Sequence, residues 1–359
     1  MKNEKQTEKR YIVFDLEWNQ SAEGRDKSEP DLPFEVIEIG AVRLNEELQI
    51  TGEFSRIVRP AVYERLHYKV IEIMHVGMEE LRKRGEPFPD VLREFMSWCG
   101  EPENENENEN ENKNENENKN GREIKPVFCT WGNMDLTELQ RNIRYYGIDN
   151  PFPYPLLYYD VQKLFNLLYE ENSKDKLPLD RAAELLGIAQ DHPFHRALDD
   201  ARYTACVMQR MDFGAVKEYL SIDYFRLPKD VKEEIYMIFP NYSKYVSHPF
   251  ETREDAIADK TVTDVICYRC NRMLRKKIRW FTANQRNYYC LAWCPEHGFV
   301  RSKIRMKHAP DGGIFVIKTT KLVDESGVRR MELRKEEMTK KRNMKNRIKR
   351  EKKTERDGE

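Results

Sequence analysis

The chain has 359 residues, of which 35% are charged and 39% hydrophobic, and its formal net charge is −1. This near-neutral total hides a division, because residues 1–266 carry a charge of −17 whereas residues 267–353 carry +18. No apolar run reaches the roughly 18 residues that a membrane span needs, and the charged N-terminal segment lacks the apolar stretch of a secretory signal. An acidic part and a basic part predict two tasks, with a polyanion as the candidate partner of the basic part.

The first part of the chain has the pattern of one mixed α/β domain that ends near residue 215. A β-rich run at Tyr11–Trp18 is followed at hairpin spacing by Phe34–Leu44 and Phe54–Val58, which predicts three antiparallel strands. Further strands are predicted at Pro126–Trp131 and Tyr158–Val161, and helices at Asp90–Trp98, Leu136–Tyr146, Gln162–Tyr169, Leu179–Leu186 and Leu198–Met211. Strands that alternate with helices in this way are typical of an α/β fold.

The remaining segments differ sharply in composition. Glu101–Asn120 is an almost pure Glu-Asn repeat without an apolar residue, so we predict a disordered insertion. Residues 216–262 mix aromatic and charged residues and are predicted to form a helical connector. Residues 263–325 contain a cluster of cysteines, and residues 326–359 form a basic tail whose sequence permits a helix.

Four acidic residues and one histidine are candidate functional residues. Asp15 and Glu17 are two apart near the end of the first strand, so both side chains leave the same face, where a cation would offset their repulsion. Asp135 follows the strand at Pro126–Trp131, and Asp200 follows His195 by five residues at the start of a helix. Each has a simpler explanation taken alone: a strand end in solvent, a helix cap, a surface histidine or an acid in a first helical turn.

The three segments FDLEW, TWGNMD and HRALDDA, in this order and spacing, resemble the DEDDh 3′-to-5′ exonuclease superfamily, and within it the ERI-type and KapD-like branch. VIEIGAVRLN, FSRIVRP and FPDVLREFMSWC also resemble that family's sheet and following helix. The resemblance covers about residues 8–215. It implies an RNase H-like domain, with a mixed five-stranded sheet flanked by helices, and a metal-dependent enzyme that shortens nucleic acid from its 3′ end.

The resemblance also implies roles for the individual residues. Asp15, Glu17, Asp135 and Asp200 would hold two Mg²⁺ or Mn²⁺ ions, and His195 would be the general base. Asp199 matches a second acid that we expect not to be a ligand, and the spacing of His192 makes it the weaker candidate for the base. Where many relatives have a Thr-Gly pair that contacts the terminal nucleotide, this chain has IMHVGM, so His75 is the candidate for that place.

The cysteine cluster has the spacing of a zinc ribbon. Cys267 and Cys270 form a Cys-x2-Cys motif, and Cys290 and Cys294 follow, with His297 close behind. We predict one structural Zn²⁺ held by the four cysteines in a small zinc-ribbon-like module, with His297 as the substitute for Cys294. The alternative is a small β-domain with buried reduced thiols. The other cysteines, Cys99, Cys129 and Cys206, lie in apolar patterns and are predicted core residues.

The basic third of the chain predicts a nucleic-acid partner. RMLRKKIRWF and VRSKIRMKH alternate basic with apolar or aromatic residues, which on strands gives one buried and one cationic face. By resemblance RNA is favoured over DNA, and docking on a ribosome or structured RNA is a further hypothesis. Seven cysteines, an odd number, favour a reducing cytoplasm. The alternative to an enzyme is a regulatory or binding protein that uses the exonuclease fold as an interaction surface.

Overall fold

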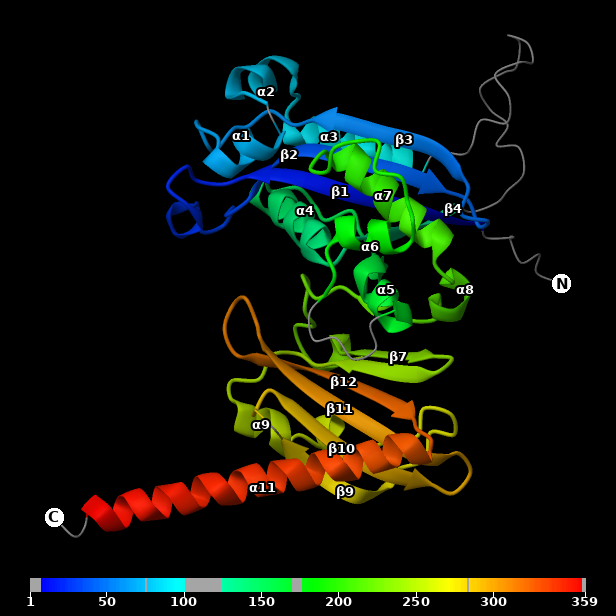
Figure 1. Ribbon diagram of the computed structural model, residues 1–359, viewed down its shortest axis with the longest axis vertical. Coiled ribbons are helices and arrows are strands. Elements are labelled where there is room, and N and C mark those ends of the chain that lie inside the picture. Colours follow the sequence, from blue (N-terminus) through cyan, green and yellow to red (C-terminus); the bar gives the residue numbers. More distant parts are fainter. Residues whose placement is uncertain (1–7, 75, 101–123, 170–175, 283, 357–359) are drawn as a thin grey trace. The chain divides into compact units, whose positions relative to one another are not determined.

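The computed structural model describes residues 8–74, 76–100, 124–169, 176–282 and 284–356. The chain divides into two compact units, residues 1–225 and residues 226–359 (Figure 1). The insertion predicted at Glu101–Asn120 and the residue His75 lie outside the described residues. No helix in the described part of the chain is both long enough and apolar enough to cross a membrane.

The first unit is built on a six-stranded mixed sheet in the order β3-β2-β1-β4-β5-β6. β1 pairs antiparallel with β2 and parallel with β4, and β4 pairs parallel with β5. The predicted mixed sheet flanked by helices is confirmed, but it has six strands instead of five because a two-residue strand pairs with the first two residues of β5. The strands are β1 (Glu8–Asn19), β2 (Glu35–Leu44), β3 (Ile50–Ile57), β4 (Ile124–Thr130), β5 (Leu157–Asp160) and β6 (Ser221–Ile222).

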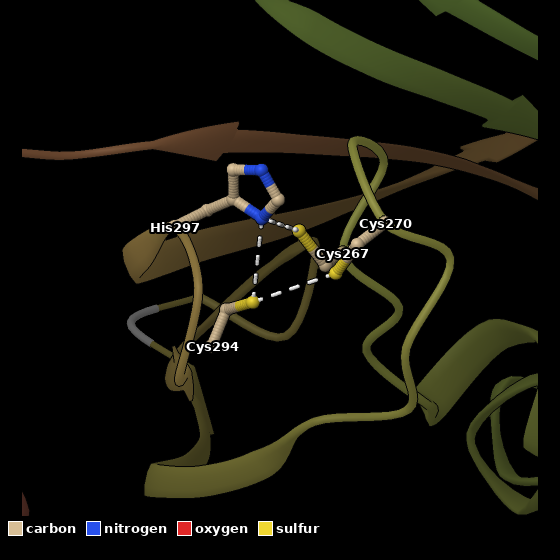
Figure 2. Close-up of side chains that lie close together, drawn as sticks. All are labelled: Cys267, Cys270, Cys294 and His297. Carbon is tan, nitrogen blue, oxygen red and sulfur yellow. Dashed lines mark hydrogen bonds between the residues drawn. The ribbon is translucent and has the colours of Figure 1, made fainter.

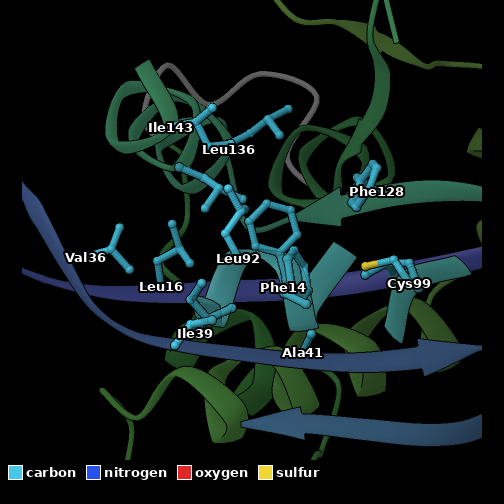
Figure 3. Packing of buried hydrophobic residues seen from close by; sticks show 14 of the residues in the cluster. Phe14, Leu16, Val36, Ile39, Ala41, Leu92, Cys99, Phe128, Leu136 and Ile143 are labelled. Atoms are coloured by element: carbon cyan, nitrogen blue, oxygen red, sulfur yellow. The ribbon is translucent and has the colours of Figure 1, made fainter. Parts of the chain in front are cut away.

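Helices cover both faces of this sheet. On one face, α3 and α4 pack on β1 and β2 through a core that includes Phe14, Ile39, Leu92 and Leu136 (Figure 3). On the other face, α5, α6 and α7 pack on a second core. The helices are α1 (Tyr68–Met74), α2 (Met78–Arg84), α3 (Phe88–Gly100), α4 (Met134–Tyr145), α5 (Val161–Tyr169), α6 (Leu179–Leu185), α7 (Ala197–Arg210) and α8 (Phe213–Val216), with a short 3-10 turn at Arg25–Lys27.

Helix α7 approaches the sheet most closely at Gly40. A Cβ atom added to Gly40 would collide with the backbone of Ala197 and Leu198 in the first turn of α7. Gly40 is also the register partner of Asp15 on β1. The absence of a side chain at this one position of β2 therefore lets the start of α7 lie against the sheet beside Asp15.

The second unit is a six-stranded antiparallel sheet in the order β7-β8-β12-β11-β10-β9. Helices α9 and α10 pack on one face of this sheet, where Val262, Ile304 and Val316 are buried together. The elements are β7 (Ile235–Phe239), β8 (Tyr242–Val246), α9 (Arg253–Ala258), α10 (Lys260–Thr263), β9 (Arg275–Thr282), β10 (Asn287–Cys294), β11 (Gly298–His308), β12 (Ile314–Leu322) and α11 (Glu325–Arg356), with a 3-10 turn at Val231–Glu233.

The prediction of a helical connector at residues 216–262 is wrong. This segment contains β7 and β8, and β8 pairs with β12, with Val246 opposite Ile317. The alternating burial in β7, IYMIF, is a strand pattern that the mixed aromatic and charged composition of the segment obscures. The second sheet therefore recruits two strands from residues that we expected to link the two parts of the chain.

The close approach at Gly40 yields the first prediction. Gly40→Ala should lower the free energy of unfolding by about 1–3 kcal/mol, because α7 must move away from β2. Thermal melting measures this effect. Gly100→Ala, at the end of α3 where no atom lies within 4 Å of an added Cβ, is the control and should be neutral. Equal stability of the two variants would refute this account of the contact.

Candidate active site and metal centre

Carboxylates from three elements meet beside β1. Asp15 and Glu17 lie on β1, Asp135 lies in the first turn of α4, and Asp200 lies in the first turn of α7. β1 and β4 run parallel as neighbours, and α4 follows β4 after a short turn, so the chain carries Asp135 back to the same end of the sheet where Asp15 and Glu17 lie. The approach of α7 at Gly40 adds Asp200. Residues from distant parts of the sequence are thereby brought into one acidic cluster.

His195 lies at the edge of this cluster, in the loop before α7. One ligand atom from each of Glu17, His195 and Asp200 lies within 4.8 Å of the others. The backbone N–H of His195 donates to Asp200 Oδ2 over 2.9 Å, and the φ angle of His195 is 72°, a conformation that non-glycine residues rarely adopt. The strained turn holds the exposed imidazole next to the carboxylates.

Electrostatic repulsion within the cluster is strong. Burial raises the pKa of Asp15 well above its usual range, and the charges of Asp135, Asp200 and Glu17 raise it further. Burial likewise raises the pKa of Asp135 to about 7, although backbone N–H groups, including that of Leu16, hydrogen-bond to its carboxylate and oppose the shift. The hydrogen bond from the backbone of Leu16 holds the Asp135 side chain against β1, so Asp135 contacts the sheet in addition to lying in the first turn of α4.

The other two carboxylates have similar shifts. Burial raises the pKa of Glu17 to about 8, with further contributions from Asp200 and from Glu38. Burial raises the pKa of Asp200 to about 7, against the opposing hydrogen bond from His195. A group of acids this close holds protons near neutral pH unless a cation replaces them.

A fifth carboxylate, Glu38, was missed by the sequence analysis. It lies on β2 opposite Glu17, is 2% exposed, and accepts hydrogen bonds from Nε and Nη2 of Arg196 over 3.2 and 3.3 Å. Arg196 directly follows His195, so this ion pair fastens the histidine loop to the sheet. Two features of the sequence could have indicated this ion pair. Glu38 is an acidic residue inside the apolar run FEVIEIGAVRL, and Arg196 directly follows the candidate His195.

The neighbouring candidates have other partners. Asp199 accepts a hydrogen bond from Arg202 over 2.8 Å, and Arg202 also binds Glu53 on β3. His192 is exposed, and its backbone N–H donates to the hydroxyl of Tyr203. Neither residue belongs to the cluster of Glu17, His195 and Asp200 in the described structure.

The donor set fits divalent cations. Asp200 Oδ1 is buried and has no hydrogen-bond partner among the described residues, although its sister oxygen has one. A buried carboxylate oxygen without a partner is costly, and a cation would satisfy it. Several carboxylates without nearby thiolates are ligands suited to Mg²⁺ or Mn²⁺.

The second unit contains a separate cluster of Cys267, Cys270, Cys294 and His297 (Figure 2). Two of the cysteines lie in the loop between α10 and β9. Cys294 ends β10, and His297 lies in the turn before β11. The Sγ atom of Cys270 lies 3.6 Å from that of Cys294, and Nδ1 of His297 lies 3.6 Å from the Sγ atoms of both Cys267 and Cys294.

These separations fit a tetrahedral zinc site. Zinc–ligand bonds of about 2.3 Å to sulfur and about 2.0 Å to nitrogen place tetrahedral ligands about 3.5–3.8 Å apart. Burial alone would raise the pKa of Cys294, but hydrogen bonds from the His297 side chain and from the backbone of Glu296 and His297 lower it to about 6. Such a thiol gives up its proton readily to a metal.

Cys290 is not part of this cluster, so the assignment of four cysteine ligands is corrected. Cys290 and Cys294 share a face of β10 but are separated by four residues, about 13 Å along an extended strand. Burial raises the pKa of the Cys290 thiol to about 12. His297 takes the place of Cys290, whereas we expected it as a substitute for Cys294. The pair Cys294-x2-His297, which repeats the spacing of Cys267-x2-Cys270, was the signal in the sequence.

The remaining cysteines lie where the sequence analysis placed them. Cys99 and Cys129 are buried in the two cores of the first unit, and Cys206 is half-buried on α7. All seven cysteines are free thiols.

The first unit matches a known protein family. The RNase_T family model, which describes an exonuclease, matches residues 12–208. Among solved structures, the chain is similar to a 3′-exonuclease that recognises the 3′ end of histone mRNA stem-loop, with 19% identity, a TM-score of 0.45 and coverage of 60% of this chain and 86% of that one. A search among curated proteins found no match.

Two further solved structures are similar. Cell-death related nuclease 4 has 18% identity, a TM-score of 0.43 and coverage of 59% of this chain and 65% of that one. Exonuclease I of E. coli, in complex with a dA16 oligonucleotide, has 13% identity, a TM-score of 0.43 and coverage of 80% of this chain and 55% of that one.

The fold and the acidic cluster define the first unit as a nuclease domain. Since the family model spans more than half of the chain, the protein belongs to the exonuclease family, and it is an enzyme that hydrolyses nucleic acid. The resemblance to the DEDDh exonucleases is thereby confirmed.

The raised carboxyl pKa values predict how stability depends on pH. Each of these acids has a higher pKa in the folded than in the unfolded protein, so without cations stability should fall as pH rises from about 4 to about 8. Without added Mg²⁺ or Mn²⁺ we expect the melting temperature to drop over this range, and added Mn²⁺ to restore it at the upper end. Asp200→Asn should reduce this pH-dependent loss of stability by roughly 1 kcal/mol or more, and the exposed control Asp180→Asn should not. A melting temperature of the wild type that does not change with pH in the absence of these cations would contradict the cluster.

The metal centre predicts which substitutions remove zinc. Wild-type protein should contain one equivalent of zinc by elemental analysis, because four ligands fill a tetrahedral site. Cys270→Ser and His297→Ala should lose the metal and destabilise the second unit, whereas the control Cys290→Ala should retain it. Loss of zinc from Cys290→Ala with retention in His297→Ala would reverse the assignment.

Proposed function

We propose that the protein is a divalent-metal-dependent 3′-to-5′ exonuclease that acts on RNA. The observation that carries this proposal is the convergence of Asp15, Glu17, Asp135 and Asp200 beside an exposed histidine. Several carboxylates buried close together are electrostatically unfavourable unless an opposite charge lies among them, so the cluster is suited to binding cations. The direction of hydrolysis and the preference for RNA rest on the resemblance of the ordered motifs to the ERI-type branch.

The four carboxylates would hold two Mg²⁺ or Mn²⁺ ions, which supply charge stabilisation and an activated water for phosphodiester hydrolysis. Within the protein, His195 is positioned to accept the proton of the attacking water, because histidine side chains change protonation near neutral pH. The hydrogen bond from its backbone to Asp200 couples the base to the metal-binding carboxylate. Arg196 and Glu38 are positioning residues that hold this loop.

The second unit would bind nucleic acid and contain the structural zinc. Its antiparallel sheet carries basic residues on alternate positions of β11, and charge of this kind attracts phosphates. Docking on structured RNA or a ribosome is part of the proposal. Seven free thiols, three of them in the zinc cluster, support a reducing compartment such as the cytoplasm.

The test is hydrolysis of 5′-labelled RNA and DNA of the same sequence with Mn²⁺ or Mg²⁺. A 5′ label retains a ladder of shortened products when cleavage proceeds from the 3′ end. We expect EDTA and Asp200→Asn to abolish shortening, and His195→Ala to slow it about 10²- to 10⁴-fold. His192→Ala, in the same loop, is the matched control and should keep wild-type activity.

Three outcomes would count against the proposal. Wild-type protein that shortens neither nucleic acid with either cation would overturn the enzymatic activity and favour a binding or regulatory role. Faster hydrolysis of DNA would overturn the choice of substrate alone. Equal losses in His192→Ala and His195→Ala would remove the assignment of the base.

A further inference from the structure

The face of the second sheet opposite α9 and α10 carries a row of cations. Along β11, Val300, Ser302, Ile304 and Met306 point into the core, so the alternate residues point to the other face. These alternate residues include Arg301, Lys303 and Arg305. Successive cations in this row are about 6.6 Å apart, since each strand residue rises about 3.3 Å.

Tyr289 lies beside this row, and its ring is in contact with cations from both β11 and α11. It is the register partner of Lys303 on β11, and Lys303 Nζ lies 5.7 Å from the centroid of its ring. Arg334 of α11 places its guanidinium 4.2 Å from the same centroid. The sheet and the first turns of α11 therefore bring cations from two elements to one aromatic ring, which attracts cations through its face.

The cations in this cluster are short of counter-charges. In the described part of the chain, Arg301, Lys303 and Arg334 form no salt bridge, and Arg330 lies near the carboxylate of Asp324. Burial, together with the charges of Arg305, Arg301 and Arg334, lowers the pKa of Lys303 to about 8. Burial and the charges of Arg334 and Arg330 also lower the pKa of Arg301. The like charges repel one another in a half-buried setting.

The attachment of α11 to this face is slight. Its start is held by a backbone hydrogen bond from Val323 to Phe299 over 3.0 Å, and Met331 is buried. Beyond Met338 every side chain of the helix that the structure describes is exposed. Figure 1 shows α11 crossing the second sheet near β10 and β11. A basic helix therefore lies on a basic face with few apolar contacts to hold it there.

We propose that Arg301, Lys303, Arg330 and Arg334, grouped around Tyr289, form a binding site for the phosphates of a single nucleic-acid strand. The site lies between β11 and the start of α11, and phosphates bound there supply the missing negative charge. It is separate from the acidic cluster of the exonuclease unit. This inference rests on the proposed function only in its choice of nucleic acid as the polyanion.

The arrangement favours a nucleic-acid strand over other anions. Arg301 and Lys303 of the site continue along β11 to Arg305, and a row of cations on alternate strand positions matches the repeating phosphates of an extended strand better than it matches a single small anion. The side chains of the cluster are Lys, Arg and Tyr, which contact phosphate without reading base edges. Binding at this site should therefore depend on charge and salt, with little dependence on sequence.

Binding of 5′-labelled oligouridylate is measured with full-length protein that carries Asp200→Asn, without added Mg²⁺ or Mn²⁺, so that hydrolysis is absent and no chelator removes zinc from the second unit. We expect Lys303→Met and Arg334→Gln each to weaken binding roughly 3- to 10-fold and to reduce the salt slope by about one. Lys335→Gln, the same change of charge on the next residue of α11, is the matched control and should change affinity less than twofold. Equal effects at Lys335 and Arg334 would overturn the site.

Stability provides the second readout. Lys303→Met removes a repelled, half-buried charge, so it should raise the melting temperature of the free protein by about 2–4 °C while it weakens binding. A residue with only a structural role would lower both. A lower melting temperature together with unchanged affinity would overturn the proposal.

The failure of this inference can be distinguished from failure of the proposed function. Unchanged oligonucleotide binding in the variants, with normal hydrolysis by the wild type, would remove this site and leave the exonuclease intact. Weakened oligonucleotide binding in the variants, with no hydrolysis by the wild type, would support this site and overturn the exonuclease. Tighter binding to anionic phosphatidylserine vesicles than to the oligonucleotide, lost in Arg334→Gln, would identify a membrane as the partner and also overturn the proposal.

Discussion

The exonuclease unit depends on the close contact between the start of α7 and the backbone of β2 at Gly40. Because Gly40 is the partner of Asp15, this contact brings Asp200 and His195 to the carboxylates of β1. The same approach forces several acids together in a partly buried space, where each raises the pKa of the others. The proposed divalent cations would offset this repulsion, so the packing at one glycine creates the electrostatic conditions that favour their binding.

The sequence predicted the parts of the fold that have local signals. Asp15 and Glu17 were placed on one face because a strand alternates, and Asp200 was placed at a helix start. The ion pair between Glu38 and Arg196 could not be predicted from local sequence patterns, since the two residues are 158 positions apart in the chain. His297 was misjudged because spacing along the chain does not show that β10 is extended between Cys290 and Cys294. β7 and β8 pair with each other, but β8 joins the rest of the sheet only through the distant strand β12, so the sequence around them did not reveal the sheet.

The two units contain clusters of opposite charge, and each lacks part of its counter-charge within the protein. Carboxylates crowd beside β1, and Lys and Arg crowd around Tyr289. Both arrangements cost stability in the free protein, and such costs are common where a site is prepared for a ligand. Cys267, Cys270, Cys294 and His297, by contrast, offer four protein ligands to one ion, as the proposed structural zinc would require.

The pairing of β8 with β12 has a consequence for biosynthesis. All contacts of the first unit are available once residue 225 has been made, so this unit can fold while the rest of the chain is still being translated. The second sheet cannot close until β12 follows, because β12 joins β8 to β11. During that interval the thiols of Cys267 and Cys270 and the edge of the β7–β8 hairpin are exposed to other chains. The second unit is therefore the later and more vulnerable part of the protein to assemble.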